Sequence, residues 1–237
     1  MQQSNSYIIT FAIAMTVIVG GLLAGANQIL KPAQQKALKL DKQKAILGTV
    51  ITLKEGDNVN DLFTKNIKSE VVDYQGNVVE GVKASSVVTR KQYKQKDKTK
   101  KLFPVYKYEQ NGKVDAYILP IYGNGLWNEI WGYIALQGDL KTVKGVVFDH
   151  AGETPGLGAR ITEGAIQKRY QNKLIFDQDG KLVSVTMVKG EGNPESALGK
   201  YKVDGMSGAT LTANGVNAML YNYLDLYLPY IKKQQNK

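Results

Sequence analysis

The chain has 237 residues, of which 43% are hydrophobic and 24 are glycine, and its formal net charge is +10. This length allows one substantial core once a short membrane segment is set aside, so one main domain is expected. Because the sequence contains no cysteine and a single histidine, His150, it excludes cysteine-ligated iron–sulfur clusters, disulfides, thiolate nucleophiles and histidine-cluster zinc sites. Any redox chemistry therefore requires an organic cofactor.

The first predicted element is a membrane anchor over residues 1–30. Residues 7–26 read YIITFAIAMTVIVGGLLAGA, without a charge. At about 1.5 Å per residue, a helix of this length spans a bilayer of about 30 Å. A cleaved signal peptide is the alternative, because Ala24-Gly25-Ala26 resembles a cleavage site. The stretch is long and lacks the usual basic residues at its start, so we favour a retained single-pass helix.

Residues 31–101 are expected to connect the anchor to the main domain. Pro32 stands at a plausible first position of an amphipathic helix that continues to about Leu47. Residues 31–101 hold 16 Lys and Arg against 8 acidic residues, whereas residues 102–237 hold 15 against 13. The positive-inside rule favours a cytoplasmic location for these lysines, but this argument is weak for a following domain of about 200 residues.

The densest basic run lies at the end of this connecting region, from Arg90 to Lys101. It contains one aromatic residue, Tyr93, and lacks the interleaved basic and aromatic residues of nucleic-acid-binding modules. We therefore expect no nucleic-acid partner. A solvated loop, or a contact with anionic headgroups or a partner protein of the membrane, explains the run better.

Residues 102–237 are expected to form the main domain. Alternation and turn residues predict an antiparallel meander of strands over 103–109, 114–121, 131–137 and 143–150. A helix over 163–170, a hairpin of 174–176 with 182–188, and a final helix over 212–231 follow. In the final helix, apolar residues recur every four positions at Val216, Leu220, Leu224 and Leu228. The order predicts an α+β fold, an antiparallel sheet with packed helices, preceded by one N-terminal transmembrane helix.

Two glycine-bearing segments are candidates for a binding site. In the first, Gly156 and Gly158 flank a leucine and allow the backbone to approach a flat ligand, although a rigid loop is the favoured explanation of the pattern taken alone. The second, residues 204–212 (DGMSGATLT), runs into the final helix, whose free N–H groups and dipole suit a phosphate. A turn at Asp204-Gly205 and a helix cap at Thr212 explain the bare pattern just as well.

The second segment resembles a flavinylation signature in which the last hydroxyl residue of SGAT carries FMN as a phosphoester; that residue here is Thr210. Residues 119–136 (LPIYGNGLWNEIWGYIAL) and 152–161 (GETPGLGARI) are similar to stretches of the C subunits of the sodium-translocating NADH:quinone oxidoreductases. The resemblance covers nearly the whole chain, strongly from about residue 103. The G subunits of Rnf complexes share ETPGLG and SGAT, but the Gly125-Leu126-Trp127 segment favours the quinone reductase family.

The resemblance implies one covalent FMN, bound through its phosphate to Thr210 and attached by a separate flavin transferase that uses FAD. Around it we expect phosphate contacts from residues 204–212, which we call the acceptor loop. We expect ring or ribityl contacts from residues 152–159, the first glycine loop. Trp127 or Tyr122 covers a face of the ring or packs in the core, and Glu153 bonds either the loop backbone or the flavin. The further candidates are Ser207, Gly208, Ala209, Thr212, Thr154, Gly156, Leu157 and Gly158.

The resemblance also implies a carrier of electrons from NADH toward quinone, among other membrane subunits of one complex. It implies a single-pass protein of the bacterial inner membrane with a periplasmic domain. No GxGxxG segment opens a βαβ unit, so the chain alone is expected to lack NADH activity, and no catalytic residue or metal ligand is assigned. The G subunit of an Rnf-type complex and a non-redox membrane-tethered binding or assembly protein remain the alternatives.

Overall fold

The computed structural model describes residues 4–236, which divide into two compact units, one ending at Lys42 and one beginning at Gln43. The first unit consists of helix α1, Asn5–Gly48, whose last residues belong to the second unit. In the described part of the chain, α1 is the one helix long and apolar enough to cross a membrane.

Helix α1 does not restart at Pro32. The proline lies inside one continuous helix, so the prediction that it begins a separate connecting helix is wrong. A proline removes one backbone N–H donor but leaves the bonds before and after it intact, and Ala, Gln and Lys on its C-terminal side are strong helix formers.

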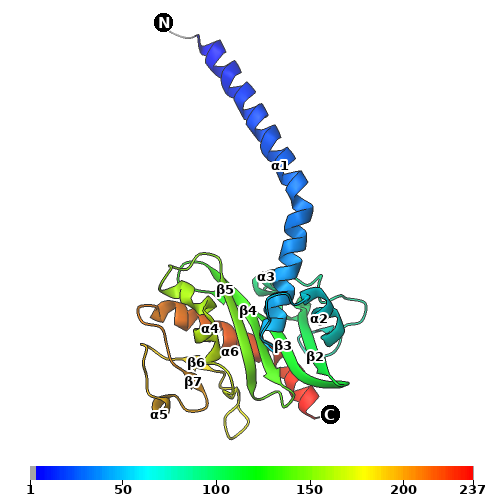
Figure 1. Ribbon diagram of the computed structural model, residues 1–237, viewed down its shortest axis with the longest axis vertical. Helices are drawn as coiled ribbons and strands as arrows, with labels where there is room; N and C mark the ends of the chain where they lie inside the picture. The colour runs from blue at the N-terminus through cyan, green and yellow to red at the C-terminus, as the bar shows by residue number, and fades with distance from the viewer. Residues whose placement is uncertain (1–3, 237) are drawn as a thin grey trace. The chain divides into compact units, whose positions relative to one another are not determined.

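The second unit is built on a five-stranded antiparallel sheet in the order β1-β2-β3-β4-β5 (Figure 1). The predicted meander and the α+β class are confirmed. The strands predicted over 114–121 and 131–137 are longer than expected, since they cover Lys113–Asn124 and Glu129–Gln137. Strands β3 and β4 pair from Ala116 with Gln137 to Asn124 with Glu129. The strands are β1 Ile67–Val72, β2 Phe103–Gln110, β3 Lys113–Asn124, β4 Glu129–Gln137 and β5 Val143–His150.

Strand β1 comes from the region that the sequence assigned to a connection. It pairs with β2 from Ile67 opposite Tyr108 to Val72 opposite Phe103. Ile67, Val71 and Val72 are buried, but the residues between them are polar or charged, which leaves only a short and irregular alternation. The sheet therefore includes a segment about 30 residues before the meander.

Helix α6, Thr210–Gln235, covers one face of the sheet, the far face in Figure 1. Its buried Val216, Leu220 and Leu224 confirm the predicted four-residue spacing. Gly123 of β3 allows a close approach, because a Cβ there would lie 2.9 Å from the Cβ of Met219. This packing brings the start of α6 to the β3–β4 connection, where the candidate loops lie.

The other face carries a second apolar cluster that includes Ile46 and Leu47 from the end of α1 and Ile118 and Ala135 from the sheet. Helix α2, Val59–Asn66, contributes Val59 to it. The basic run then forms two short helical turns instead of an unstructured loop, α3 Thr89–Lys94 and η1 Lys98–Lys100. Helix α3 is tied to the sheet because Arg90 and Lys94 form ion pairs with Glu129, at 2.8 Å and 3.1 Å.

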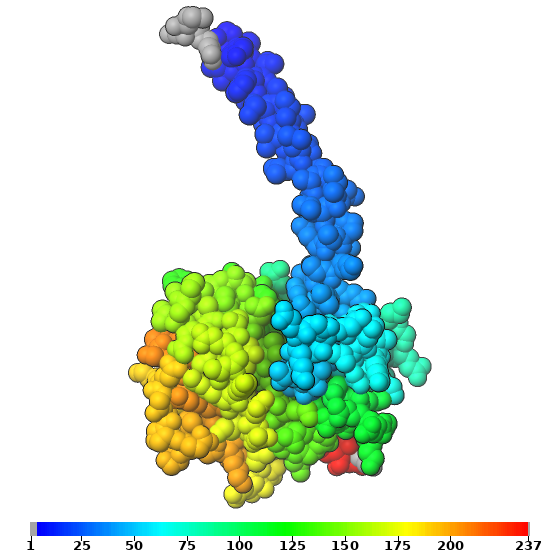
Figure 2. Space-filling model, viewed as in Figure 1, coloured from blue at the N-terminus to red at the C-terminus, as the bar shows by residue number. Residues whose placement is uncertain are grey.

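Residues 151–209 form short elements and loops on one side of this unit, coloured yellow to orange in Figure 2 from about residue 175. The predicted hairpin is confirmed around its turn, where Phe176 and Leu182 form a bridge and the Val183 N–H donates to the Ile175 carbonyl at 2.9 Å. It does not continue to residue 188, because Ser184 has a φ of +61° and interrupts the extended run. The remaining pair, β6 and β7, is parallel. The elements are η2 Gly158–Thr162, α4 Gly164–Lys168, β6 Thr186–Met187, α5 Glu195–Leu198 and β7 Lys202–Val203.

Candidate functional site

Glu153, in the first glycine loop, connects that loop to the β3–β4 connection and to the start of α6. Its side chain is buried, with 4% of the residue exposed. Carboxylate Oε1 accepts hydrogen bonds from the backbone N–H groups of Trp127, at 2.9 Å, and Asn128, at 3.3 Å. Carboxylate Oε2 accepts one from the hydroxyl of Thr212, at 2.5 Å. Of the two roles expected for Glu153, the structure shows the hydrogen bonds to loop backbone.

These hydrogen bonds determine the charge of Glu153. Burial alone raises its pKa, but the hydrogen bonds from Thr212, Trp127 and Asn128 lower it more, so the pKa lies below its usual value. Donors that stabilise the ionised form keep Glu153 a carboxylate at neutral pH. His150 also takes part, because its Nδ1 accepts a hydrogen bond of 3.2 Å from the Glu153 backbone.

Two glycines make room for this carboxylate. A Cβ at Gly125 would lie 2.5 Å from Glu153 Oε1, and a Cβ at Gly158 would lie 2.6 Å from Oε2 and collide with the Thr212 hydroxyl. The space over Gly158 is thus filled by Glu153 and Thr212. Glycine at these positions lets three loops close on one buried side chain.

The acceptor loop enters α6 without a side-chain cap. Ala209 is the N-cap residue and makes no capping hydrogen bond, and Thr210 is the first residue of the helix. Thr212, two residues on, donates to Glu153, so the interpretation of Thr212 as a simple helix cap is wrong. The first-turn N–H groups of a helix have no intrahelical acceptors, so the start of α6 presents donors near Thr210.

A pocket of about 190 Å³ lies between the two glycine loops. It brings together most of the residues that the sequence selected, while Ser207, Gly156 and Trp127 lie outside its lining. Tyr122 is 5% exposed, contacts Tyr93 at a ring distance of 5.3 Å, and packs in the core instead of lining this pocket. The lining residues are Leu126, Glu153, Thr154, Leu157, Gly158, Gly208, Ala209, Thr210, Leu211 and Thr212.

Four exposed apolar residues form what we call the apolar rim: three line the pocket, and Trp127 follows one of them in the chain. Each of the four residues is exposed to solvent by 41% to 69%. Contiguous exposed apolar side chains mark binding surfaces more often than plain protein surface. Sequence reasoning singled out Trp127 and Leu157 but missed the other two. The rim consists of Leu126, Trp127, Leu157 and Leu211.

A network of charged side chains behind the acceptor loop was not anticipated. Arg160 donates to both carboxylate oxygens of Glu191, each at 2.9 Å, and Arg169 donates to the same carboxylate at 2.8 Å. The two guanidinium groups hold the pKa of Glu191 well below its usual range. The sequence carries no local signal for this network, because its members lie 22 and 31 residues apart.

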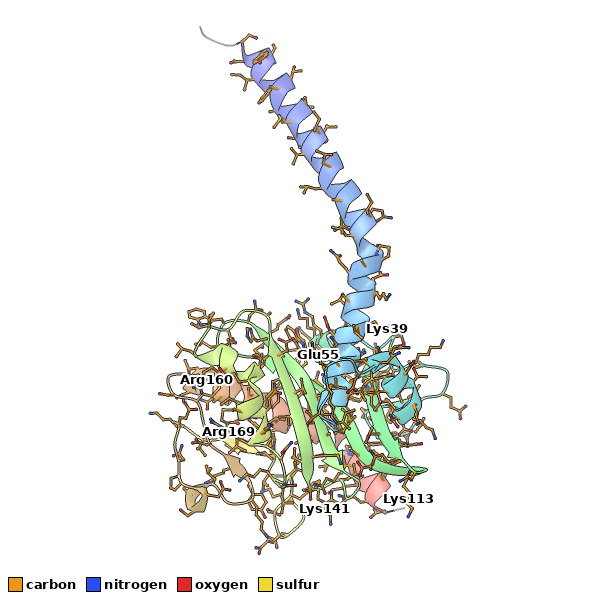
Figure 3. All side chains as sticks on the ribbon, in the orientation of Figure 1. Lys39, Glu55, Lys113, Lys141, Arg160 and Arg169 are labelled. Carbon is orange, nitrogen blue, oxygen red and sulfur yellow. The ribbon has the colours of Figure 1, made fainter. Side chains whose placement is uncertain are left out.

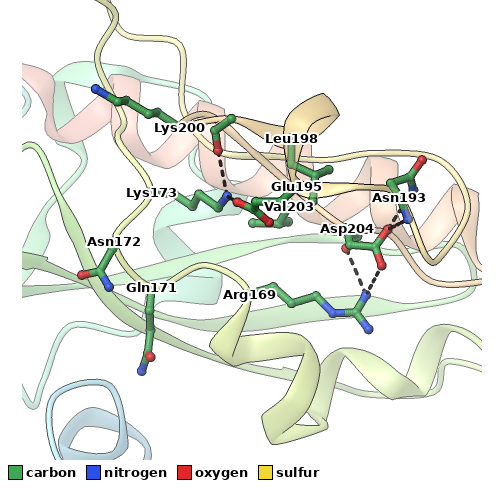
Figure 4. A pocket seen from close by; sticks show the side chains of 11 residues that line it. Arg169, Gln171, Asn172, Lys173, Asn193, Glu195, Leu198, Lys200, Val203 and Asp204 are labelled. Atoms are coloured by element: carbon green, nitrogen blue, oxygen red, sulfur yellow. Dashed lines mark hydrogen bonds and ion pairs between the residues drawn. The ribbon is translucent and has the colours of Figure 1, made fainter.

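A larger cavity, about 620 Å³, lies beside this network and includes Arg169 and Asp204 (Figure 4). Its other charged side chains largely satisfy one another. Lys173 donates to Glu195 at 2.9 Å and to the carbonyl of Gly199 at 2.7 Å. Among residues 4–236, no group of three His, Cys, Asp or Glu side chains is arranged to hold a metal ion.

Comparison with known proteins identifies the chain's relatives. Residues 125–225 match the family described as FMN-binding domain. The chain is 32% identical to the C subunit of the Na(+)-translocating NADH-quinone reductase of Pseudomonas aeruginosa, with 98% of both chains covered. It is 33% identical to the corresponding C subunit of Haemophilus ducreyi, with 98% of this chain and 95% of that chain covered.

Solved structures agree with these sequence relatives. The crystal structure of the same C subunit from Parabacteroides distasonis superposes with a TM-score of 0.73 at 32% identity, covering 85% of this chain and 96% of that chain. Shewanella oneidensis NqrC gives a TM-score of 0.73 at 30% identity, with 85% and 100% covered.

Proposed function

The chain belongs to the family of C subunits of the Na(+)-translocating NADH-quinone reductases and contains an FMN-binding domain, and on this basis we propose that it carries one FMN esterified through its phosphate to Thr210. The position of Thr210 carries the proposal: it is the first residue of α6 and lines the pocket between the two glycine loops. The resemblance of the DGMSGATLT segment to the flavinylation signature selects the same residue.

The surroundings of Thr210 suit a phosphodiester. The first turn of α6 supplies N–H donors and the positive end of the helix dipole, both of which favour an anion. Ala209 has no hydroxyl with which to occupy these donors, and Gly208, with a φ of +72°, leads the chain into the helix. Donors and space therefore remain available for a phosphate at Thr210.

Attachment is a phosphoryl transfer from FAD. Thr210 Oγ1 attacks the phosphorus of the FMN half and forms a P–O bond, the diphosphate P–O bond breaks, AMP leaves, and the hydroxyl proton passes to a base of the transferase. No electrons are exchanged. Glu153 is the one ionisable side chain among the residues that line the pocket, and both of its oxygens already accept hydrogen bonds. A separate flavin transferase supplies the base and the cations that this pocket lacks.

When bound, the flavin accepts and passes on electrons, while the chain supplies attachment, orientation and exclusion of water. The apolar rim would cover the ring, and Trp127 and Leu157 are the side chains that would hold it. Glu153 holds the Trp127 loop through two backbone N–H groups and the acceptor helix through Thr212. Ser207, Gly208, Ala209 and Thr212 form the phosphate end, and Thr154, Gly156 and Gly158 the ribityl side.

Within the oxidoreductase complex, this protein relays electrons between a site that oxidises NADH in another subunit and the quinone. Its partners are the other membrane subunits. The absence from the sequence of a GxGxxG segment that opens a βαβ unit supports this division of labour. The named relatives are C subunits of the quinone reductase, which favours this complex over a role as the G subunit of an Rnf-type complex.

The apolar part of α1 anchors the protein in the bacterial inner membrane, and the domain lies on the periplasmic side. Protease added to intact spheroplasts should digest the domain and leave a cytoplasmic control protein whole. A domain that is protected until the cells are lysed would contradict this orientation.

The attachment is tested on the full chain in detergent, incubated with a flavin transferase, FAD and Mg²⁺. After denaturation, the wild type should keep a flavin absorption spectrum and gain the mass of one FMN less one water. Thr210→Ala should gain neither, while Tyr221→Phe, an exposed α6 residue away from the loop, should behave as wild type. An unmodified wild type beside a transferase that modifies a known substrate would leave the non-redox binding protein as the better account.

A further inference from the structure

The acceptor loop is held by charged side chains that come from outside the flavinylation signature. Glu191 lies between β6 and α5, and its flanking glycines, Gly190 and Gly192, have φ values of +82° and +84°. Besides Arg160 and Arg169, its carboxylate accepts a hydrogen bond of 3.3 Å from the backbone N–H of Ser207. Figure 3 labels both arginines, which come from the η2 and α4 region. One carboxylate thus links three segments.

Arg169 extends the same contacts to the first residues of the signature. Its Nη1 donates to the carbonyl of Asp204 at 3.1 Å and to that of Gly205, and its guanidinium lies 3.7 Å from the Asp204 carboxylate (Figure 4). Asp204 in turn accepts hydrogen bonds from the backbone N–H groups of Gly192, at 2.8 Å, and Asn193, at 3.0 Å. The Glu191 loop is therefore hydrogen-bonded to the signature at two places, Asp204 and Ser207.

The segment that follows is held at Met206 and Ala209, which are buried in the core and joined by a hydrogen bond from the Ala209 N–H to the Met206 carbonyl. Between them, Ser207 and Gly208 are exposed, Gly208 adopts a positive φ, and the helix starts without a side-chain cap. A segment with a glycine hinge and an uncapped helix start has several accessible conformations unless contacts from outside select one. The backbone bond to Ser207, three residues before the acceptor, supplies such a contact.

We propose that Glu191, together with Arg160 and Arg169, is a positioning clamp that holds Ser207 and thereby presents the Thr210 hydroxyl for flavin transfer. The inference rests on the proposed attachment at Thr210 and adds residues that the signature does not contain. Glu191 touches neither the hydroxyl nor the flavin; it acts through the backbone of the acceptor loop.

A purely structural ion-pair cluster would behave differently. The side chains of Arg160, Arg169 and Glu191 are 23% to 28% exposed, and the bidentate contact of Arg160 together with the second arginine forms a network that contributes to stability. A cluster with that role alone leaves the transfer rate of the folded protein unchanged. A clamp that aligns a nucleophile, in contrast, affects the rate steeply, because small misplacements of a reacting group are costly. Substituting Glu191 should therefore slow flavin transfer even at temperatures where the variant is fully folded.

The test compares Glu191→Ala, Glu191→Gln and a matched control, Asp115→Asn, in the full chain. Asp115 forms a 2.7 Å ion pair with Lys144, at 38% and 27% side-chain exposure, between β3 and β5 and away from the acceptor loop. We expect Glu191→Ala to slow flavin transfer on the order of 10- to 100-fold. Glu191→Gln keeps an oxygen that accepts from Ser207 and should lose less, and Asp115→Asn should match the wild type.

Two further measurements separate position from stability. Flavin transfer is measured well below the melting temperature of each variant, where all of them are folded, and amide hydrogen exchange at residues 207–210 should speed up only in the Glu191 variants. If Glu191→Ala does not fold, Glu191→Gln decides. Wild-type transfer rates in a folded Glu191 variant would overturn the clamp alone. A wild type that takes up no flavin would overturn the proposed attachment, and the clamp with it.

Discussion

Two carboxylates hold the two loops that meet at the pocket, and they do so in different surroundings. Glu153 is buried and accepts hydrogen bonds from neutral donors, whereas Glu191 is partly exposed and faces two guanidinium groups. Breaking the first leaves donors unsatisfied in the interior, whereas the guanidinium groups of the second are partly exposed and can be hydrated when their acceptor is lost. The contrast indicates that Glu153 determines the stability of the site and Glu191 its local geometry.

Removing the buried carboxylate should have the largest effect. Glu153→Ala leaves the N–H groups of Trp127 and Asn128 and the hydroxyl of Thr212 without their acceptor, and we expect it to lower the free energy of unfolding by about 3 kcal/mol. Urea denaturation measures the loss. A loss no greater than that of Glu191→Ala would remove the contrast between the two carboxylates.

Filling the space beside Glu153 should come next. A Cβ at Gly158 collides with the Thr212 hydroxyl, so Gly158→Ala should cost about 2 kcal/mol through forced repacking. Gly164→Ala is the matched control, because nothing lies within 4 Å of a Cβ there, and it should be neutral or slightly stabilising. Equal urea midpoints for the two variants would show that the packing around Glu153 yields easily.

The acceptor loop should respond less to a methyl group. Gly208→Ala places an alanine at a φ of +72° and 2.9 Å from Leu157, and should cost about 1.5 kcal/mol. Gly156→Ala has nearly the same φ, +74°, with nothing within 4 Å, so thermal unfolding of the pair separates backbone strain from the Leu157 contact. A larger loss of stability for Gly156→Ala than for Gly208→Ala would show that the Leu157 contact adds nothing to the cost at Gly208.

Acid should weaken the Glu153 contacts selectively. Because the folded-state pKa of Glu153 lies below its usual value, its contribution to stability is complete above the unfolded pKa, about 4.5. That contribution is lost as the pH falls through the folded pKa. The unfolding free energy of Glu153→Gln should therefore fall less steeply below about pH 4.5 than that of the wild type. Parallel pH curves for the two proteins would exclude Glu153 as the titrating group.

Trp127 should give the smallest change in stability. Its side chain is largely exposed, so Trp127→Ala should alter the unfolding free energy by no more than about 0.5 kcal/mol. The same substitution should raise the solvent accessibility of the attached flavin, measured by quenching of its fluorescence with iodide. Unchanged quenching would show that Trp127 does not cover the ring.

The parts of the fold that sequence predicted are those with local, regular patterns. The strands between residues 103 and 150 are rich in β-branched and aromatic residues and are separated by turn residues such as Asn111-Gly112, and α6 has buried apolar residues every four positions. Strand β1 was assigned to a connection because charged residues interrupt its three buried positions. The β6–β7 pair was missed because its partners lie 16 residues apart and run parallel.

The candidate site divides in the same way. Thr210 was selected from one short segment, and its place at the start of α6 agrees with that segment's own pattern. The contacts that hold the site are not local: Glu153 meets Trp127 and Thr212 at separations of 26 and 59 residues. In the sequence, a glutamate between two glycines, as at Glu191, indicates a turn and no more. The contacts of Glu191 with Arg160 and Arg169 form only in the folded chain.

The most direct test of the account is to localise the attached group on the flavinylated full chain. Trypsin should release residues 203–232 as one peptide, which holds Ser207, Thr210 and Thr212 together with four tyrosines. Fragment-ion masses then assign the modification to one of these residues. We expect the FMN on Thr210, with Ser207 and Thr212 unmodified. A modification on Ser207 or Thr212, or an unmodified peptide beside a flavin-containing protein, would contradict the central claim.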